Sequence, residues 1–228
     1  MNSSVDTYGR GIVSGRAIVL DTARLVDALG YDLIGIQDHP YEPGHIDTVT
    51  LAAYVLAVTE NVRVFPDVLN LALRAAPLVA KTAASLDRLS GGRFDLGLGA
   101  GGVPDGIAAM GGPAPGAIDP PEFLAEGAEL VRMFWNGQSS ITWDGRYHHV
   151  AGLRPGPPPA HPIGVWLGGH RSHMLDVIGR TVDGWVCPLD RYLPPAQAAR
   201  KNGRIDAAAQ QAGRRPAAIR RSTTSTGG

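Results

Sequence analysis

Short aliphatic runs alternate with amphipathic stretches along most of this chain. The aliphatic runs, at residues 33–36, 62–71, 94–98, 163–167, 185–187 and 219–224, have the composition of buried strands. Stretches with helical spacing of apolar residues cover 20–29, 47–59, 78–89, 121–136, 172–181 and 194–212. Strands of this kind that alternate with helices predict a parallel sheet in an α/β fold.

Residues suited to helix ends and turns agree with this segmentation. Asp47 is placed to cap the helix over 47–59, because its carboxylate can accept from free N–H groups of the first turn. The spacing within this helix predicts a buried stripe of Leu51, Tyr54, Val55 and Val58. Asp144 and Gly145 stand between β-prone residues and predict a hairpin, inserted near residues 138–151.

The alternation fits either a TIM (β/α)8 barrel or an open doubly wound sheet. About six strands follow the first helix, and the glycine-rich segment 8–19 is a candidate for another strand. A complete TIM barrel takes about 250 residues, whereas this chain has 228. We therefore expect one domain over residues 1–228, clearest over 20–221, with a TIM (β/α)8-type barrel that is incomplete at its C-terminus.

Composition narrows the classes of partner and compartment. The formal net charge is zero, so neither nucleic acid nor an anionic membrane is expected as a partner. No apolar run reaches the roughly 20 residues of a membrane span, and the first residues lack the regions of a signal peptide. The single cysteine, Cys187, excludes an internal disulfide and fits a reducing compartment. These features predict a soluble, cytoplasmic protein.

Polar residues follow the predicted strands at the points where they end. Gln37, Asp38 and His39 come directly after the run 33–36. Parallel α/β folds place their chemistry at the carboxyl ends of the strands, so we expect a pocket there. A metal site is not expected, because the adjacent His148 and His149 would point to opposite faces of a strand.

Several motifs resemble those of a known superfamily. They are Asp-His-Pro-Tyr at 38–41, Asp-Val-Leu-Asn-Leu at 67–71, Ser-Gly-Gly-Arg-Phe at 90–94 before Leu-Gly-Leu-Gly-Ala-Gly at 96–101, and Pro-Ile-Gly-Val-Trp-Leu-Gly-Gly at 162–169. Over about residues 21–221 the chain is similar to the luciferase-like flavin-dependent oxidoreductases, which include bacterial luciferase and the deazaflavin (F420)-dependent enzymes. The resemblance implies a TIM barrel that binds reduced FMN or F420 at its strand ends and forms a homodimer. It also implies closing strands and helices beyond the C-terminal end of this chain.

His39 is the candidate for proton transfer. An imidazole titrates near neutrality and is the commonest general acid or base, and the resemblance implies a histidine beside the reactive ring at this position. The alternative is a structural histidine that bonds a backbone carbonyl. Asp38 either orients the imidazole, as carboxylates do for catalytic histidines, or anchors a neighbouring helix.

Asn70 and two glycines are candidates for holding the ring. The amide of Asn70 offers a donor and an acceptor, which match the edge of a flavin pyrimidine ring, although an Asx-type turn is the alternative. Residues 97–102 satisfy Gly-x-Gly-x-x-Gly, but Pro104 and Gly106 interrupt the helix that a dinucleotide fingerprint requires. Gly99 and Gly101 are therefore expected to line a strand end beside the flat ring.

Gly168, Gly169, His170 and Arg171 precede the helix over 172–181 and are the candidate phosphate site. Glycines let backbone N–H groups approach an anion, and the helix dipole and Arg171 add positive potential. A plain turn between strand and helix is the alternative.

The resemblance implies hydride transfer or monooxygenation of a small organic substrate. F420 is slightly favoured over FMN, because Asp38 and His39 resemble the corresponding pair in the users of F420. Two other hypotheses stay open at this point. One is a non-catalytic or degenerate flavin-binding paralogue with an open barrel, and the other is a TIM-barrel enzyme that uses no flavin.

Overall fold

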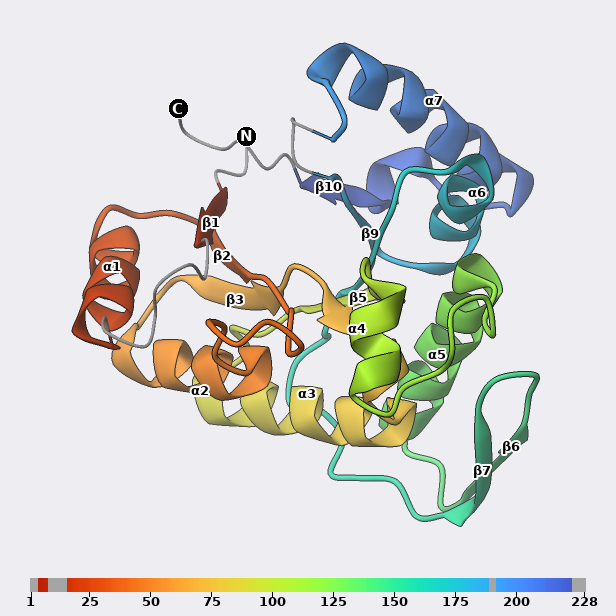
Figure 1. Cartoon of the computed structure of the whole chain (residues 1–228), viewed down its shortest axis with the longest axis horizontal. Coiled ribbons are helices and arrows are strands. Elements are labelled where there is room, and N and C mark those ends of the chain that lie inside the picture. Colours follow the sequence, from red (N-terminus) through yellow and green to blue (C-terminus); the bar gives the residue numbers. More distant parts are fainter. Residues whose placement is uncertain (1–3, 8–15, 189–191, 223–228) are drawn as a thin grey trace.

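Parallel strands follow one another in chain order through the centre of the molecule, with helices outside them (Figure 1). The computed structural model describes residues 4–7, 16–188 and 192–222. One sheet contains β1 (Ser4–Thr7), β2 (Leu33–Ile36) and β3 (Arg63–Pro66). The other contains β4 (Leu69–Asn70), β5 (Leu96–Gly99), β8 (Val165–Gly168), β9 (Gly184–Val186) and β10 (Arg220–Ser222).

A parallel bridge between Val64 and Phe94 joins the two sheets. Val64 donates its N–H to the carbonyl of Arg93 (2.9 Å) and accepts from the N–H of Asp95 (3.1 Å). The parallel strands therefore follow one another in the order β1, β2, β3, β4, β5, β8, β9 and β10, which is the chain order of strands in a β/α barrel. No ladder joins β1 to β10 within the described ranges.

The principal helices lie on the outer side of the strands (Figure 1). They are α1 (Arg16–Ala28), α2 (Thr48–Val58), α3 (Ala76–Ser90), α5 (Pro120–Trp135), α6 (Ser172–Thr181) and α7 (Pro195–Gln211). Shorter turns of helix are η2 (Leu71–Leu73), α4 (Pro104–Ala109) and η3 (Pro216–Ala218). No helix in the part of the chain that the structure describes has the length and apolar character to cross a bilayer.

The predicted hairpin is confirmed. Strands β6 (Ile141–Asp144) and β7 (His149–Leu153) pair antiparallel, and Asp144 lies opposite His149. Residues 145–148 therefore form the loop, which is longer than the two-residue turn that Asp-Gly favours. The carboxylate of Glu126, on α5, accepts the backbone N–H groups of residues 146–148 and holds this longer loop.

One strand prediction was wrong in extent, and another is tested only in part. Residues 62–71 do not form one strand, because pairing is interrupted at Asp67 and Val68, which a cis peptide bond joins. Pro66 ends β3 and has no N–H for the ladder. In the segment 8–19, residues 16–19 belong to α1, and residues 8–15 lie outside the described ranges.

The buried face of α2 also differs from its prediction. Asp47 caps this helix as expected, since its carboxylate accepts from the N–H of Thr50 at 2.9 Å. Tyr54, however, is 53% exposed, whereas Ala52 and Leu56 are buried. Nearly every residue of α2 is apolar, so the sequence pattern could not define which face packs inward.

Helix α4 corrects a third expectation. Pro104 and Gly106 do not interrupt helical structure there, because Pro104 stands in the first turn, where its missing N–H costs nothing. The helix is short and ends at Ala109.

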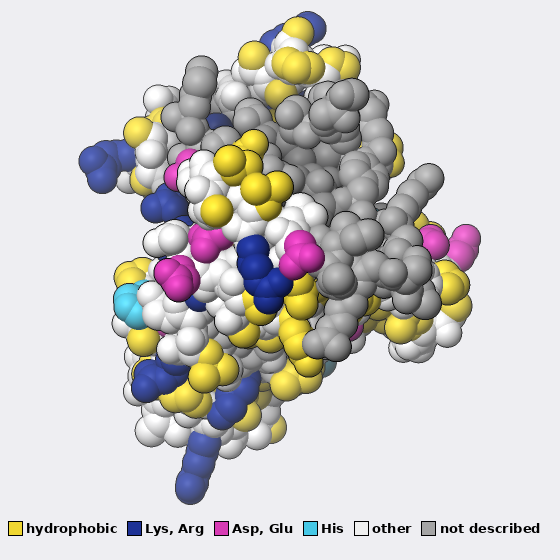
Figure 2. Space-filling model, turned by 90° about the vertical axis from the view of Figure 1, so that its left-hand side faces the viewer, with side chains coloured by type: hydrophobic (Ala, Val, Ile, Leu, Met, Phe, Trp, Pro, Cys, Tyr) yellow, Lys and Arg dark blue, Asp and Glu magenta, His cyan; other side chains and the backbone are white. Residues whose placement is uncertain are grey.

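Apolar side chains on α1 and α2 reach the surface. Leu25 of α1 is 58% exposed, Leu29 directly after α1 is 64% exposed, and Tyr54 of α2 is 53% exposed. Figure 2, which looks at the left-hand side of Figure 1, shows apolar side chains lying between charged ones on this face of the molecule.

A small apolar cluster lies apart from the main core and forms the floor of the site. It consists of Leu33, Phe65, Trp166 and Val186, with Val68 packed against it. The rings of Phe65 and Trp166 lie 6.1 Å apart. Gly35 follows Leu33 on the same face of β2, and a Cβ there would lie 3.1 Å from the Phe65 ring. Large side chains therefore fill the interior at the floor, and small residues leave space between the floor and the carboxyl ends of the strands.

Candidate functional site

A cavity of about 340 Å³ lies at the carboxyl ends of the strands. The predicted site residues that line it are Asp38, His39, Asn70, Gly99, Gly101, Gly168 and Gly169. His170 and Arg171 do not line it. Segments that are far apart in the sequence thus meet at one mouth, as the parallel strand order requires. The roles predicted for these residues stay predictions.

Glycines on the inner face make this cavity. A Cβ on Gly99 would lie 2.3 Å from Cγ2 of Val68, and a Cβ on Gly168 would lie 3.2 Å from both methyl groups of Val68. Since real Cβ atoms do not approach within 3 Å of other carbons, a larger residue at position 99 would have to displace Val68. The glycines therefore keep the walls flat, and Val68 lies between them.

His39 lies at the mouth of the cavity beside two other rings. Its Nδ1 is 2.8 Å from the hydroxyl oxygen of Tyr41, and its ring centroid is 5.5 Å from that of His45. Burial, and then the proximity of His45, lower the pKa of His39, although Asp38 and Glu42 act in the opposite direction. The imidazole is thus neutral at physiological pH and can both give and accept a proton.

Asp38 is buried, and its carboxylate is hydrogen-bonded to residues other than His39. Its Oδ2 accepts from the Nη1 of Arg74 (2.6 Å) and from the backbone N–H of Asn70 (2.7 Å). Its Oδ1 accepts from the Nη2 of Arg74 at 3.2 Å. Of the two roles open for Asp38, these contacts are those of an anchor: the carboxylate holds Arg74 and the backbone of Asn70 at the end of β4, and Tyr41 contacts the imidazole instead.

Asn70 has a buried side chain that no described residue satisfies. It is 1% exposed, and neither its Nδ2 nor its Oδ1 has a hydrogen-bond partner among the described residues. The Asx-type turn is ruled out, because the side chain does not cap η2. A Cβ on Gly101 would lie 2.8 Å from the Nδ2, so the glycine leaves room for this amide.

Positive groups gather at the N-terminus of α6, next to the cavity. Lys201 of α7 donates from its Nζ to the carbonyl of His170 at 2.7 Å. Burial, followed by Lys201 and Arg171, lowers the pKa of the His170 imidazole. Gly168 is the last residue of β8, and Gly169 connects this strand end to the positive groups.

Sequence reasoning missed Tyr41, Arg74 and Lys201. Tyr41 lies within the Asp-His-Pro-Tyr motif and could have been considered as a partner of His39. Neither Arg74 nor Lys201 carries a local signal, because each acts on a residue about 30 or more positions away.

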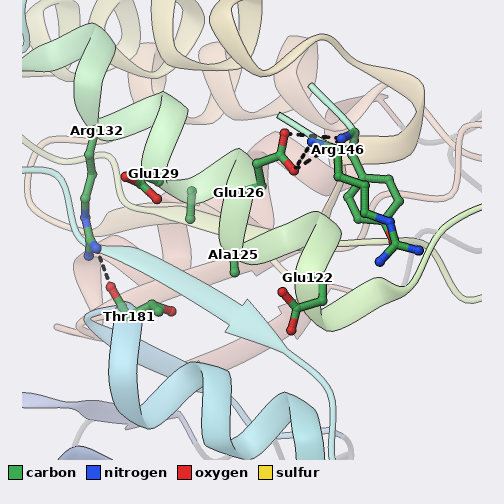
Figure 3. A pocket seen from close by; sticks show the side chains of 9 residues that line it. Glu122, Ala125, Glu126, Glu129, Arg132, Arg146 and Thr181 are labelled. Carbon is green, nitrogen blue, oxygen red and sulfur yellow. Dashed lines mark hydrogen bonds between the residues drawn. The ribbon is translucent and has the colours of Figure 1, made fainter. Parts of the chain in front are cut away.

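A larger cavity, of about 490 Å³, lies on the outer side of α5 (Figure 3). Two of its charged side chains already serve the fold. Glu126 binds the hairpin loop, and Arg132 donates to the carbonyl of Thr181 and to Asp183. The larger cavity also lies away from the strand ends, so we place the functional site in the cavity of about 340 Å³.

The histidines of the hairpin have separate partners. His148 contacts the carbonyl of Phe123 at 3.1 Å, and His149 contacts the carboxylate of Asp144 at 2.8 Å. Across the described ranges, no three His, Cys, Asp or Glu side chains are grouped as metal ligands.

Comparisons with known proteins agree on one family. The sequence model described as "luciferase-like monooxygenase" matches residues 7–226. An uncharacterised protein of Mycobacterium tuberculosis (strain ATCC 25618 / H37Rv) is 31% identical over 170 residues, which cover 70% of this chain and 57% of that protein. An F420-dependent glucose-6-phosphate dehydrogenase of Intrasporangium calvum is 29% identical over 181 residues, covering 75% of this chain and 53% of the enzyme. The chain thus spans a little over half the length of these two relatives.

A solved structure shows the same fold. The F420-dependent tetrahydromethanopterin reductase of Methanopyrus kandleri superposes with a TM-score of 0.84 at 18% identity. The match covers 96% of this chain and 64% of the reductase chain. With the parallel strand order, it confirms the predicted α/β fold of the TIM-barrel type.

Proposed function

The chain belongs to the luciferase-like monooxygenase family, and from this premise we propose that it is an oxidoreductase that binds F420 or FMN at its strand ends and acts on a small organic substrate. The observation that carries this proposal is the buried amide of Asn70 in the wall of the cavity, which has no hydrogen-bond partner among the residues that the structure describes. A buried amide without partners is costly, so such a group calls for a ligand that bonds it.

The residues at the cavity fit a flat ring with a polar edge. The pyrimidine edge of a flavin or deazaflavin carries donors and acceptors, which the Nδ2 and Oδ1 of Asn70 complement. The walls beside Asn70 are formed by Gly99 and Gly101, which leave space where side chains would intrude. The floor is apolar, as suits the body of an aromatic ring.

The N-terminus of α6 is the proposed place for the phosphate. Backbone N–H groups at Gly169, His170 and Arg171 precede or open this helix, and the helix dipole favours an anion there. Lys201 and Arg171 add positive charge beside His170, which supports this assignment over a plain turn.

When bound, the cofactor would supply the electron chemistry. His39 would then hold or move the proton at the reacting substrate atom, because its imidazole is neutral and lines the cavity. Asp38 would act indirectly, by fixing the backbone of Asn70 through the bond from its N–H.

F420 is slightly preferred over FMN. The pair Asp38 and His39 resembles that of F420 users, and one of the relatives is named an F420-dependent dehydrogenase. Monooxygenation with reduced FMN is the second candidate, which the description of the matching family favours. We likewise propose that the substrate is a small molecule and that the protein forms a homodimer, as the resemblance implies.

Titration of the purified protein with F420, FMN and riboflavin, followed by absorbance and fluorescence, tests the proposal. We expect micromolar or tighter binding of F420 or FMN, and turnover when the reduced cofactor and candidate substrates are added. Binding without turnover of any substrate would support the non-catalytic paralogue instead. If neither cofactor bound, the proposed function would be wrong.

A further inference from the structure

The hydrogen bond between His39 and Tyr41 bears on how the imidazole acts. The Nδ1 of His39 and the hydroxyl oxygen of Tyr41 are 2.8 Å apart, and the two rings meet edge to face with centroids 5.6 Å apart. A neutral imidazole protonates only one of its nitrogens, and the bond made by one nitrogen decides the state of the other. Tyr41 therefore stands where it can select the tautomer of His39.

Helix α4 fixes the ring of Tyr41 in this place. A Cβ on Gly106 would lie 2.8 Å from Cγ and 3.1 Å from Cδ2 of Tyr41. Only a glycine at position 106 leaves the room that the tyrosine ring occupies. The position of the phenol thus depends on a contact between the loop after β2 and helix α4, which follows β5.

Other titratable groups around His39 do not make this contact. Asp38 is bonded to Arg74 and to the N–H of Asn70. The remaining charged or titratable groups in the described part of the chain are His45 and Glu42, which share the loop of His39, and Asp67, Cys187 and Tyr192, which face the cavity from the other strand ends. Among the described residues, only Tyr41 is hydrogen-bonded to the imidazole of His39.

The phenol of Tyr41 is a proton donor under physiological conditions. Burial, and then the carboxylates of Asp38 and Glu42, raise the pKa of Tyr41 above its ordinary value. The hydroxyl therefore keeps its proton, and an unprotonated imidazole nitrogen is a good acceptor for it.

We infer that Tyr41 is a positioning residue: it donates its hydroxyl hydrogen to the Nδ1 of His39, so that the imidazole carries its proton on Nε2. A protonated Nε2 is a donor, which suits a substrate with an acceptor oxygen, such as a carbonyl, at its reacting position. The substrate class rests on the proposed function, whereas the tautomer does not.

Nitrogen-15 NMR of histidine-labelled protein, without cofactor, tests the tautomer directly at a pH above the pKa of His39. We expect the Nδ1 shift of an unprotonated nitrogen that accepts a hydrogen bond, and the Nε2 shift of a protonated one. Tyr41→Phe should move both shifts toward those of an unconstrained tautomer mixture. A protonated Nδ1 in the native protein, or unchanged shifts in Tyr41→Phe, would overturn the inference.

A second pair of variants distinguishes loss of the Tyr41–His39 contact from a general disturbance of the structure. Gly106→Ala should change the His39 shifts in the same direction as Tyr41→Phe, because its Cβ displaces the phenol. Gly44→Ala is the matched control, since it lies in the loop of Tyr41 and its Cβ would meet no atom within 4 Å. Unchanged shifts in a folded Gly106→Ala protein would contradict the proposed packing.

The kinetic consequence is a lower kcat with little change in cofactor affinity. Loss of one hydrogen bond that orients the imidazole predicts a decrease of kcat of about fivefold to tenfold in Tyr41→Phe. The His39 limb of the pH–rate profile should shift as well. Absence of cofactor binding in the native protein would count against the proposed function alone, because the NMR experiment does not depend on it.

Discussion

Arg74 binds the carboxylate of Asp38 with both terminal nitrogens of its guanidinium group, at 2.6 and 3.2 Å, across a sequence separation of 36 residues. The Asp38 side chain is 1% exposed and that of Arg74 is 17% exposed, so the pair lies largely out of water. Asp38 also accepts from the N–H of Asn70. This ion pair therefore helps to fix the position of Asn70, whose amide forms part of the cavity wall.

Replacing Arg74 by methionine should destabilise the protein strongly. The change leaves a buried carboxylate without its cation, which costs about 3–5 kcal/mol. Chemical denaturation measures this loss. The control is Arg24→Met, because Arg24 pairs with Asp21 on the surface, with side chains 53% and 69% exposed. Equal stabilities of the two variants would show that the buried pair contributes no more than an exposed one.

Asn70→Ala should weaken cofactor binding and leave stability nearly unchanged. We expect affinity for F420 or FMN to fall about tenfold, because two hydrogen bonds to a buried amide are lost. Asn202→Ala is the matched control, since Asn202 on α7 also has an unpartnered buried side-chain oxygen but does not line the cavity. Undiminished affinity in Asn70→Ala would remove the main support for the proposed site.

Lys201→Met should weaken FMN binding but spare riboflavin, which lacks the phosphate. The ammonium group lies beside the N-terminus of α6, and its loss predicts a decrease in FMN affinity of about threefold at low ionic strength. The difference should diminish at high salt, where charges are screened. Lys81→Met is the control, because Lys81 also donates to a backbone carbonyl, that of Gly156. A parallel loss of riboflavin affinity would argue against a phosphate contact.

Cys187 should react slowly with alkylating reagents at pH 8 in the native protein. Burial, and then the carboxylate of Asp67, raise the pKa of its thiol to about 11, from an ordinary value of 9.0. The reactive thiolate is consequently rare at this pH. Iodoacetamide kinetics with and without denaturant measure the difference, and equal rates would contradict the burial of the thiol.

The same shift predicts a pH dependence of stability. Because the folded state holds the proton more tightly, this contribution is fully present below about pH 9 and is lost as the pH rises toward 11. The free energy of unfolding should therefore fall less steeply over this range in Cys187→Val than in the native protein. Tyrosines titrate in the same range, but both proteins contain the same tyrosines, so their contribution to the pH dependence cancels in the comparison.

The order of elements was readable from local patterns. Aliphatic runs marked the strands, Asp47 marked the start of α2, and Asp144 with Gly145 marked the hairpin. Predictions were wrong where the local pattern does not define one answer. The largely apolar α2 has no sequence pattern that marks its buried face, and a proline such as Pro104 can either interrupt a helix or begin one.

The position of most candidate site residues at one cavity was also predictable. Parallel strands carry their carboxyl ends to the same edge, so His39, Asn70 and Gly168 were expected to meet there. Their partners were not predictable. Asp38 had two open roles, and only the placement of Arg74 showed which of them the fold uses.

The sequence by itself determined the alternation of strands and helices, the resemblance to a family and the edge of the sheet that holds the site. Tertiary structure alone decided that Tyr41 contacts His39, that Lys201 reaches α6, and that the amide of Asn70 has no partner among the described residues. The reason is physical: periodicity and capping act between near neighbours in the chain. The hydrogen bonds of Arg74 and Lys201, at 2.6 and 2.7 Å, instead join residues more than 30 positions apart, so they depend on the spatial positions of whole elements. The ring of Tyr41 is close to His39 in the chain, but its place also depends on the room that the distant Gly106 leaves.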